Sequence, residues 1–181
     1  QINSSAKQQI AKQAAALVND GDSIFLGSGS TASYVSQYLK SHDRLTITTN
    51  AVTVIQELAP INTINLIVLG GLLRASELSM IGHITEQALR EVRVDKVIVG
   101  MRGIDITAGL TSDYLPEVMT DRAIMDMSGK VVVLADSTKL GHIASGYVAP
   151  IERMTTLITD SKADSNFIAQ LRENEIEVIL V

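Results

Sequence analysis

The chain has 181 residues, of which 46% are hydrophobic and only 3% aromatic. This length suits one domain with a full core, and that core must consist of Ile, Val, Leu, Ala and Met, as in α/β proteins with a buried sheet. The net charge of −5 comes from 15 basic and 20 acidic residues without long blocks, which argues against the clustered basic face that nucleic acid requires. We expect one domain over residues 1–181 that does not bind DNA by itself.

Cysteine is absent, which excludes disulfides, thiol catalysis and zinc–thiolate sites. No apolar run approaches the roughly 20 residues that span a bilayer, and no secretory signal is present. We therefore expect a cytoplasmic location and no membrane partner. Because the first residue is Gln1 and not Met, we also expect the polypeptide to be a piece of a longer one.

In the first half of the chain, apolar residues at helical spacing predict a helix over residues 4–19. A strand at 23–26 leads through a glycine loop into a helix at about 31–40. A strand at 45–48, a helix ending at Pro60 and a strand at 64–69 follow. Residues 72–79 are compatible with a hairpin arm or a loop.

In the second half, the patterns predict a helix at 82–92, a strand at 96–99, a helix at 115–127 and a strand at 131–135. Residues 141–149 are predicted to form a surface loop, before a strand at 155–158, a helix at 163–173 and a strand at 176–180. Short apolar strands that alternate with helices indicate a Rossmann-like α/β fold, with a mostly parallel sheet covered by helices on both faces.

Unusual residues follow five of the predicted strands. They are Gly27–Thr31, Thr49-Asn50, Gly70-Gly71, Gly100–Asp105 and Asp136–Lys139. The carboxyl ends of parallel strands lie along one edge of a sheet, where ligands bind. Since these five spacings are independent of one another, their convergence predicts a shared binding site.

The loop Gly27-Ser28-Gly29-Ser30-Thr31 joins a strand to a helix start. Such a loop directs backbone N–H groups and hydroxyls at one anionic group, and the helix adds its unpaired N–H groups and dipole. It also fits a dinucleotide-binding pattern, but Thr48-Thr49-Asn50 stands where that pattern needs an acid. We therefore predict a compact phosphorylated ligand and no NAD; the alternative is a tight turn without a ligand.

Four charged residues near the strand ends are candidate ligand contacts. Lys139 either meets a phosphate or caps a surface loop, and Arg74 either grips a phosphate bidentately or forms a solvated or inter-subunit ion pair. Asp105 accepts hydrogen bonds from sugar hydroxyls or closes a turn. Glu117 follows a proline at a helix start, where compensation of the helix dipole also explains it.

The three histidines, at positions 42, 83 and 142, stand too far apart for a local metal pair. The chain contains no G-x-S-x-G elbow and no G-x-x-x-x-G-K-[ST] loop, so serine hydrolase and nucleotide hydrolase functions lack support. We predict no metal and no cofactor.

Taken together, the motifs resemble the C-terminal effector-sensing domain of DeoR-type bacterial transcriptional repressors, over essentially the whole chain. They are Asp20-Gly21-Asp22, Gly27-Ser28-Gly29-Ser30-Thr31, Thr49-Asn50, Gly70-Gly71-Leu72-Leu73-Arg74, Ile81-Gly82, Gly103-Ile104-Asp105 with Gly109-Leu110-Thr111, and Leu134-Ala135-Asp136-Ser137-Thr138-Lys139. The resemblance implies a fold similar to ribose-5-phosphate isomerase and a phosphorylated sugar or related metabolite as effector. It also implies a winged helix-turn-helix upstream of this chain, through which DNA is bound, and assembly as a homodimer or homotetramer.

The motifs and the resemblance together define a predicted effector site. Its residues are Ser28, Gly29, Ser30, Thr31, Thr49, Asn50, Gly70, Gly71, Arg74, Gly103, Asp105, Glu117, Asp136 and Lys139. The family's usual loop begins Asp-Ser-Gly-Thr-Thr, whereas this chain has Gly27 and Ser30 at the first and fourth positions. The change removes a carboxylate that would accept hydrogen bonds from sugar hydroxyls, so the identity of the effector stays open.

The leading hypothesis is a ligand-sensing, non-enzymatic module whose effector changes the oligomer and hence the spacing of the DNA-binding heads. The alternative is an aldose–ketose phosphate isomerase, for which Asp105, Glu117 and Lys139 are suitable residue types. The chain lacks the Lys-Gly-rich segment that precedes the acidic base of that enzyme family. A third hypothesis is an oligomerisation domain that has lost its ligand.

Overall fold

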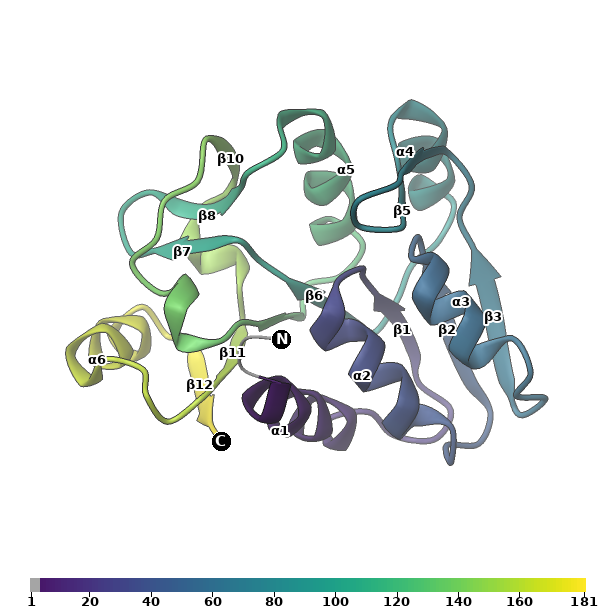
Figure 1. The fold of residues 1–181 in the computed structure, drawn as a ribbon, viewed down its shortest axis with the longest axis horizontal. Coiled ribbons are helices and arrows are strands. Elements are labelled where there is room, and N and C mark those ends of the chain that lie inside the picture. Colours follow the sequence, from purple (N-terminus) through teal and green to yellow (C-terminus); the bar gives the residue numbers. More distant parts are fainter. Residues whose placement is uncertain (1–3) are drawn as a thin grey trace.

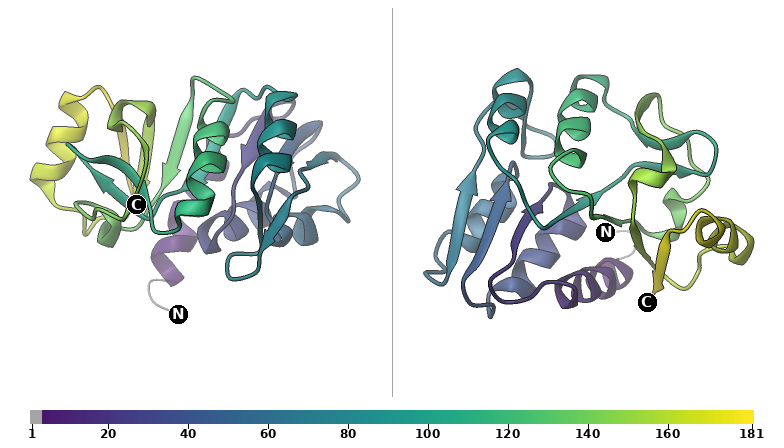
Figure 2. Two further views of the ribbon diagram at one scale, coloured as in Figure 1. Left: turned by 90° about the horizontal axis from the view of Figure 1, so that it is seen from above. Right: turned by 180° about the vertical axis from the view of Figure 1, so that it is seen from behind.

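The computed structural model describes residues 4–181 as a parallel sheet between two layers of helices (Figures 1 and 2). The sheet has seven strands in the order β12-β11-β9-β6-β1-β2-β3. Its strands are β1 (Ser23–Leu26), β2 (Leu45–Thr49), β3 (Ile64–Val68), β6 (Lys96–Gly100), β9 (Val131–Leu134), β11 (Thr156–Thr159) and β12 (Glu177–Leu180). Every pairing within this sheet is parallel. The predicted fold class is confirmed.

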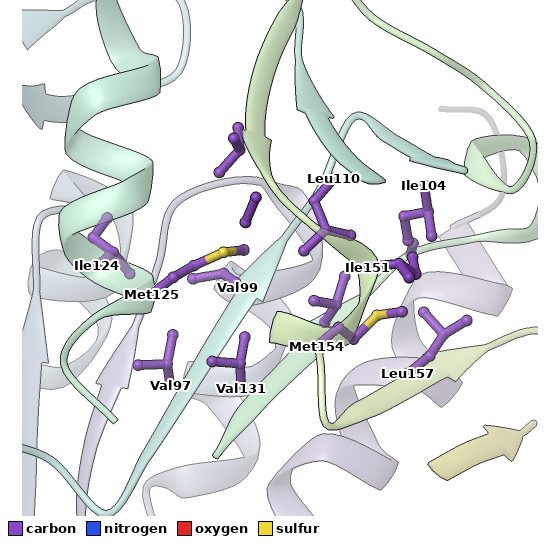
Figure 3. Close-up of a cluster of buried hydrophobic side chains, with 14 of the residues drawn as sticks. Val97, Val99, Ile104, Leu110, Ile124, Met125, Val131, Ile151, Met154 and Leu157 are labelled. Atoms are coloured by element: carbon purple, nitrogen blue, oxygen red, sulfur yellow. The ribbon is translucent and has the colours of Figure 1, made fainter. Parts of the chain in front are cut away.

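The sheet separates two hydrophobic clusters. On one face pack α1 (Ser4–Ala16), α2 (Ser30–Leu39) and α3 (Val52–Leu58), and on the other pack α4 (His83–Arg90), α5 (Leu115–Met125) and α6 (Ser165–Glu173). Strand β9 shows the division, since Val131 and Val133 face the α5 side (Figure 3) and Val132 and Leu134 face the α1 side. A strand buried on both faces has apolar residues at every position, as this one does.

Two small antiparallel sheets lie beyond the carboxyl edge of the main sheet. The hairpin of β4 (Leu72–Arg74) and β5 (Ser79–Ile81) confirms one of the two alternatives for residues 72–79. The second sheet contains β7 (Gly103–Asp105), β8 (Gly109–Ser112) and β10 (Gly146–Ala149). The prediction of a surface loop over 141–149 is therefore wrong for its second half: β10 pairs with β8, and Val148 packs against the α5-side cluster.

Differences at other element ends are small. The helix predicted over 4–19 ends at Ala16, and the last three predicted elements begin one or two residues later than expected. Two single-turn helices, η1 (Ser137–Lys139) and η2 (Ile151–Arg153), complete the assignment. Within residues 4–181, no helix has both the length and the apolar character needed to cross a bilayer.

Candidate functional site

A cavity of about 550 Å³ opens above the carboxyl ends of β1, β6 and β9. The chain builds the sheet outward in one direction from β1 to β3 and in the other from β6 to β12, so β1 and β6 flank the topological switch point. Connections leave such a point toward opposite faces of the sheet, and a crevice opens between them. The cavity thus lies where an α/β sheet of this kind holds its ligand.

The glycine loop and the start of α2 form one wall of the cavity, through Ser28, Gly29, Ser30 and Thr31. Gly29 precedes the helix with a φ of 103° and open space around its Cα, a backbone conformation that favours glycine. The N–H of Ser33 donates the first hydrogen bond of the helix, to the carbonyl of Gly29 (3.1 Å). The N–H groups before it have no acceptor inside the helix, so they suit an anion.

Two lysines extend this wall. Lys7 comes from α1, which packs along α2, and Lys139 comes from the turn after β9. That turn is held by Asp136, whose carboxylate accepts from the backbone N–H of Thr138 (3.0 Å), and by Asp160, whose carboxylate accepts from the N–H of Ser137 (2.7 Å). Neither lysine forms an ion pair with any residue in the 4–181 range. Their charges are therefore available to a ligand.

The β4–β5 hairpin forms the roof of the cavity, and its base is fixed to the end of β2. The N–H of Val52 donates to the carbonyl of Leu78 (2.8 Å), and the N–H of Met80 donates to the carbonyl of Asn50 (2.8 Å). The side-chain amide of Asn50 donates to the carbonyl of Met80 (2.9 Å). Asn50 therefore positions the hairpin that covers the cavity.

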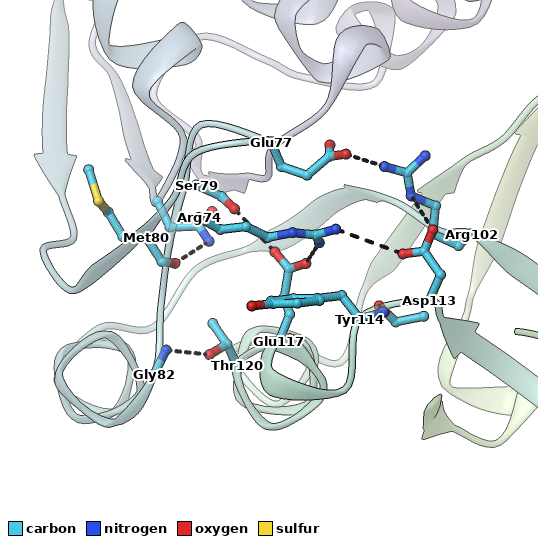
Figure 4. Close-up of polar contacts among 12 residues, drawn as sticks. Arg74, Glu77, Ser79, Met80, Gly82, Arg102, Asp113, Tyr114, Glu117 and Thr120 are labelled. Atoms are coloured by element: carbon cyan, nitrogen blue, oxygen red, sulfur yellow. Dashed lines mark hydrogen bonds and ion pairs between the residues drawn. The ribbon is translucent and has the colours of Figure 1, made fainter. Parts of the chain in front are cut away.

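Arg74, on β4, lies at the centre of a polar network inside the cavity wall (Figure 4). Its guanidinium forms an ion pair with Glu117 of α5 and stacks over the ring of Tyr114, 4.2 Å from the ring centroid. The hydroxyl of Ser79 donates to the same Glu117 carboxylate (3.2 Å). The network joins the hairpin to α5, on the face of the sheet opposite α1 and α2.

A second arginine links the hairpin tip to the turn after β6. Arg102 forms an ion pair with Glu77, and its Nε lies 3.7 Å from a carboxylate oxygen of Asp113. Asp113 is also 4.0 Å from Arg74. Both arginines in this part of the cavity are therefore neutralised by carboxylates of the protein.

Asp121 lines the cavity one helical turn beyond Glu117 on α5. Burial raises the pKa of its carboxyl well above the ordinary value, and repulsion from Glu117 adds to the increase. Arg74 lowers the pKa and offsets part of this increase, whereas Asp113 raises the pKa further. Within residues 4–181, Asp121 forms no ion pair.

Eight of the predicted site residues line the cavity and six do not. Those that line it are Ser28, Gly29, Ser30, Thr31, Arg74, Glu117, Asp136 and Lys139. Those behind or beside it are Thr49, Asn50, Gly70, Gly71, Gly103 and Asp105. The last six support the walls through hydrogen bonds or close packing. Among residues 4–181, the buried Oδ1 of Asn50 has no hydrogen-bond partner.

Thr49 and Asp105 illustrate this supporting role. The Thr49 hydroxyl donates to the carbonyl of Leu26 (2.7 Å) and accepts from the N–H of Ala51. The Asp105 carboxylate accepts from the N–H groups of Thr107 and Ala108 (2.9 and 2.8 Å), so it closes the β7–β8 turn. Turn closure was one of the two alternatives that the sequence left open for Asp105.

Gly70, Gly71 and Gly103 are kept by contacts outside the cavity. The carbonyl of Gly70 accepts from the hydroxyl of Thr85 (2.7 Å), and a Cβ on Gly71 would collide with that same threonine. A Cβ on Gly103 would collide with Thr111 in the neighbouring strand. Gly71 and Gly103 therefore allow close packing of the chain, whereas a Cβ on Gly70 would meet nothing within 4 Å.

Gly27 has a structural reason to be glycine. It is buried where β1 ends, and a Cβ placed on it would lie 3.0 Å from Cγ1 of Val99 on β6. A larger residue at this position requires Val99 to move. At position 27 this chain therefore has a glycine where the family usually has Asp, and β1 and β6 pack closely there.

Sequence patterns missed four charged residues of the cavity: Lys7, Glu77, Arg102 and Asp121. Arg102 belongs to the Gly100–Asp105 segment that the sequence singled out, yet only Gly103 and Asp105 of that segment belong to the predicted site. Asp121 lies four residues after Glu117, a spacing that places both acids on one face of a helix. This spacing is the sequence signal from which Asp121 could have been predicted as a site residue. Among residues 4–181, the structure contains no group of three or more acidic or histidine side chains suited to hold a metal.

Comparison with known proteins finds a family and several relatives that match most of this chain. The family described as the DeoR C terminal sensor domain matches residues 2–161. The glycerol-3-phosphate regulon repressor of Escherichia coli (strain K12) is 29% identical over 174 residues, which cover 96% of this chain and 69% of that protein. The HTH-type transcriptional regulator IolR of Bacillus subtilis (strain 168) is 27% identical, with 96% of this chain and 69% of that protein covered.

Among solved structures, a ribose 5-phosphate isomerase A from Methanocaldococcus jannaschii is similar in fold. Its TM-score is 0.55 at 23% sequence identity, and the match covers 76% of this chain and 55% of the isomerase. The likeness establishes the fold alone. Since the family match extends over most of the residues and the related proteins are transcriptional regulators, the chain belongs to the DeoR family of regulators as its C-terminal sensor domain.

Proposed function

We propose that this sensor domain binds a small phosphorylated metabolite, such as a sugar phosphate, in the cavity at the β1–β6 switch point. The observation that carries the proposal is the cationic wall, where the start of α2 faces the cavity together with Lys7 and Lys139. Free helix N–H groups, hydroxyls and unpaired ammonium groups are the donors that a phosphate monoester requires. The volume of about 550 Å³ suits a ligand of this size.

We further propose that the effector controls DNA binding by a winged helix-turn-helix segment that precedes this domain in the full-length protein, and that copies of the chain associate. Related proteins are longer than this chain and are named as repressors or HTH-type regulators. The β4–β5 hairpin supports a link between effector binding and the association of the copies. It carries Arg74 and Glu77 into the cavity, and it also exposes Leu72 and Leu73.

A sugar-phosphate isomerase is the weaker candidate. Such an enzyme needs a free carboxylate base within reach of the substrate's C1–C2 protons. Asp105 closes a turn outside the cavity, and Glu117 is paired with Arg74. A direct isomerase assay with pentose and hexose phosphates separates the candidates: we expect no turnover, and turnover that Glu117→Gln abolishes would overturn the choice.

Thermal melting with a panel of pentose, hexose and triose phosphates at millimolar concentration tests the sensor function. We expect at least one of them to raise the Tm, because a ligand that binds only the folded chain stabilises it. Lys139→Gln should reduce that shift. Lys130→Gln, at the opposite end of the same strand β9, is the control and should leave it unchanged. No shift with any member of the panel would refute the proposal.

A further inference from the structure

Lys7 brings α1 into contact with the effector cavity. It lies in the first turn of that helix and lines the same wall as the glycine loop and Lys139. α1 packs beside α2 (Figures 1 and 2) and also contacts β9 and β11 on the same face of the sheet. A phosphate bound at the start of α2 therefore lies next to both helices.

The first turn of α1 has little apolar packing of its own. The buried residues of this helix all follow that turn and are Ile10, Ala11, Ala14 and Ala15. From Ser4 to Gln9, no residue is buried. Helices in proteins are held mainly by the packing of their apolar face, so a terminal turn without such packing opens at a low cost in free energy.

A weak polar contact joins this turn to α2. The hydroxyls of Ser4 and Tyr34 are 3.3 Å apart, which is long for a hydrogen bond between two hydroxyls. Lys7, in the same turn, has an ammonium group that forms no ion pair within residues 4–181. A charged contact between the first turn of α1 and the start of α2 thus lacks only an anion between them.

We propose that the phosphate of the effector bridges Lys7 to the start of α2 and so docks the first turn of α1 onto the domain. The ammonium group and the N–H groups of α2 would bind different oxygens of one phosphate. The phosphate gains the Lys7 contact only in the docked state, and this difference in affinity between two states is what a conformational signal requires.

The inference rests on the proposed sensor function and describes its regulation. In that proposal the DNA-binding segment precedes this domain, and α1 is the helix that lies between that segment and the cavity. A phosphate that fixes the first turn of α1 would therefore fix the direction in which the chain enters the domain.

Hydrogen exchange followed by mass spectrometry measures the opening of this turn, because the N–H groups of Gln8, Gln9 and Ile10 donate to its carbonyls. The probes are D-ribose 5-phosphate, D-glucose 6-phosphate and sn-glycerol 3-phosphate, with ribose, glucose and glycerol as controls. We expect a phosphorylated probe that raises the Tm to slow exchange of these amides about tenfold at saturation, since a hydrogen bond between charged groups contributes about that factor. The unphosphorylated compounds should have no effect.

Three lysine variants separate docking of α1 from occupancy of the cavity. Lys7→Gln should abolish the slowing even at saturation and, by reciprocity, weaken binding by up to about tenfold. Lys139→Gln should also weaken binding but keep the slowing at saturation, because Lys139 belongs to η1 and not to α1. Lys12→Gln is the matched control: Lys12 is exposed on α1 and does not line the cavity, so both quantities should stay unchanged.

The outcomes distinguish the inference from the proposed function. A probe that raises the Tm without slowing exchange of Gln8–Ile10 would overturn the docking of α1 and leave the sensor function intact. Slowing that persists in saturated Lys7→Gln, or that is lost in saturated Lys139→Gln, would overturn the role of Lys7. Failure of every phosphorylated probe to bind would refute the sensor function itself.

Discussion

Arg74 and Glu117, 43 residues apart in the sequence, form an ion pair that ties the β4–β5 hairpin to α5 across the cavity. Their side chains are only 14% and 9% exposed. The pair therefore lies in a medium where loss of one charge leaves the other poorly solvated. It also fixes the hairpin that forms the roof of the ligand cavity.

Arg74→Met should lower the free energy of unfolding by about 3 kcal/mol, because it leaves Glu117 buried and unpaired. Adding Glu117→Gln should restore part of the loss. The control is Lys40→Met, which removes the exposed Lys40–Glu57 pair (40% and 33% exposed) and should cost less than about 1 kcal/mol. Urea denaturation measures all four chains. Equal costs for the two single variants would contradict a structural role of the buried pair.

Asp160 should support the cavity from behind. Burial raises the pKa of its carboxyl, but hydrogen bonds from the N–H groups of Ser137 and Lys162 outweigh burial and lower the pKa overall. The ionised Asp160 carboxylate therefore stabilises the folded state above the ordinary pKa of 3.8. This stabilisation is lost as the pH falls through the pKa of Asp160 in the folded chain. Asp160→Ala should cost about 1–3 kcal/mol at neutral pH, since two backbone N–H groups lose a charged acceptor that is itself buried. Chemical denaturation at pH 7 and in acid measures the difference, and a pH-independent cost would contradict this account.

Asp121 should show the opposite pH dependence. Its pKa is raised in the folded chain, mainly by burial and then by Glu117. The folded state then holds a proton that the unfolded state loses above pH 3.8, so stability falls as the pH rises from that value toward the folded-state pKa. Asp121→Asn removes this loss and should be more stable than the wild type at neutral pH, with the difference disappearing in acid. Melting curves from pH 3 to pH 8 test this, and a less stable variant at pH 7 would contradict it.

Gly27→Ala should destabilise the chain by about 1–3 kcal/mol, because the added Cβ would lie 3.0 Å from Val99. In a Val99→Ala background the same substitution should cost clearly less. Gly129→Ala, where a Cβ would meet nothing within 4 Å, serves as the control. Additive costs of Gly27→Ala and Val99→Ala would show that the contact does not decide the residue at position 27.

Leu72→Asp should weaken association between copies of the chain. Leu72 is 70% exposed on the hairpin that follows β3, and β3 is the edge strand of the main sheet. Exposed apolar residues at a sheet edge mark an interaction surface. Sedimentation should give a dimer or tetramer for the wild type and a smaller species for the variant. Ile143→Asp, at an isoleucine that is 57% exposed in the loop before β10, should not change the mass. A wild-type monomer would refute the association.

The order of strands and helices was accessible from the sequence because its signals are local. Runs such as Val131–Leu134 are apolar at every position, and the glycine loop marks the passage from β1 to α2. Strands β7, β8 and β10 were not predicted. Each is only three or four residues long, too short for a clear pattern. β7 and β8 form a short hairpin, and β10 joins β8 across a long separation, as between Tyr147 and Thr111, which no local pattern records.

The sequence by itself determined the α/β class, the family and the edge of the sheet at which a ligand site would lie, since these follow from periodicity and from motifs at strand ends. Only the tertiary structure decided which residues form the cavity. The hydroxyl of Thr49 and the side-chain NH₂ of Asn50 donate to backbone carbonyls outside the cavity, whereas Arg102 and Asp121 line it. The reason is that lining a cavity depends on which side chains remain unpaired once distant segments meet, and that property belongs to the folded chain.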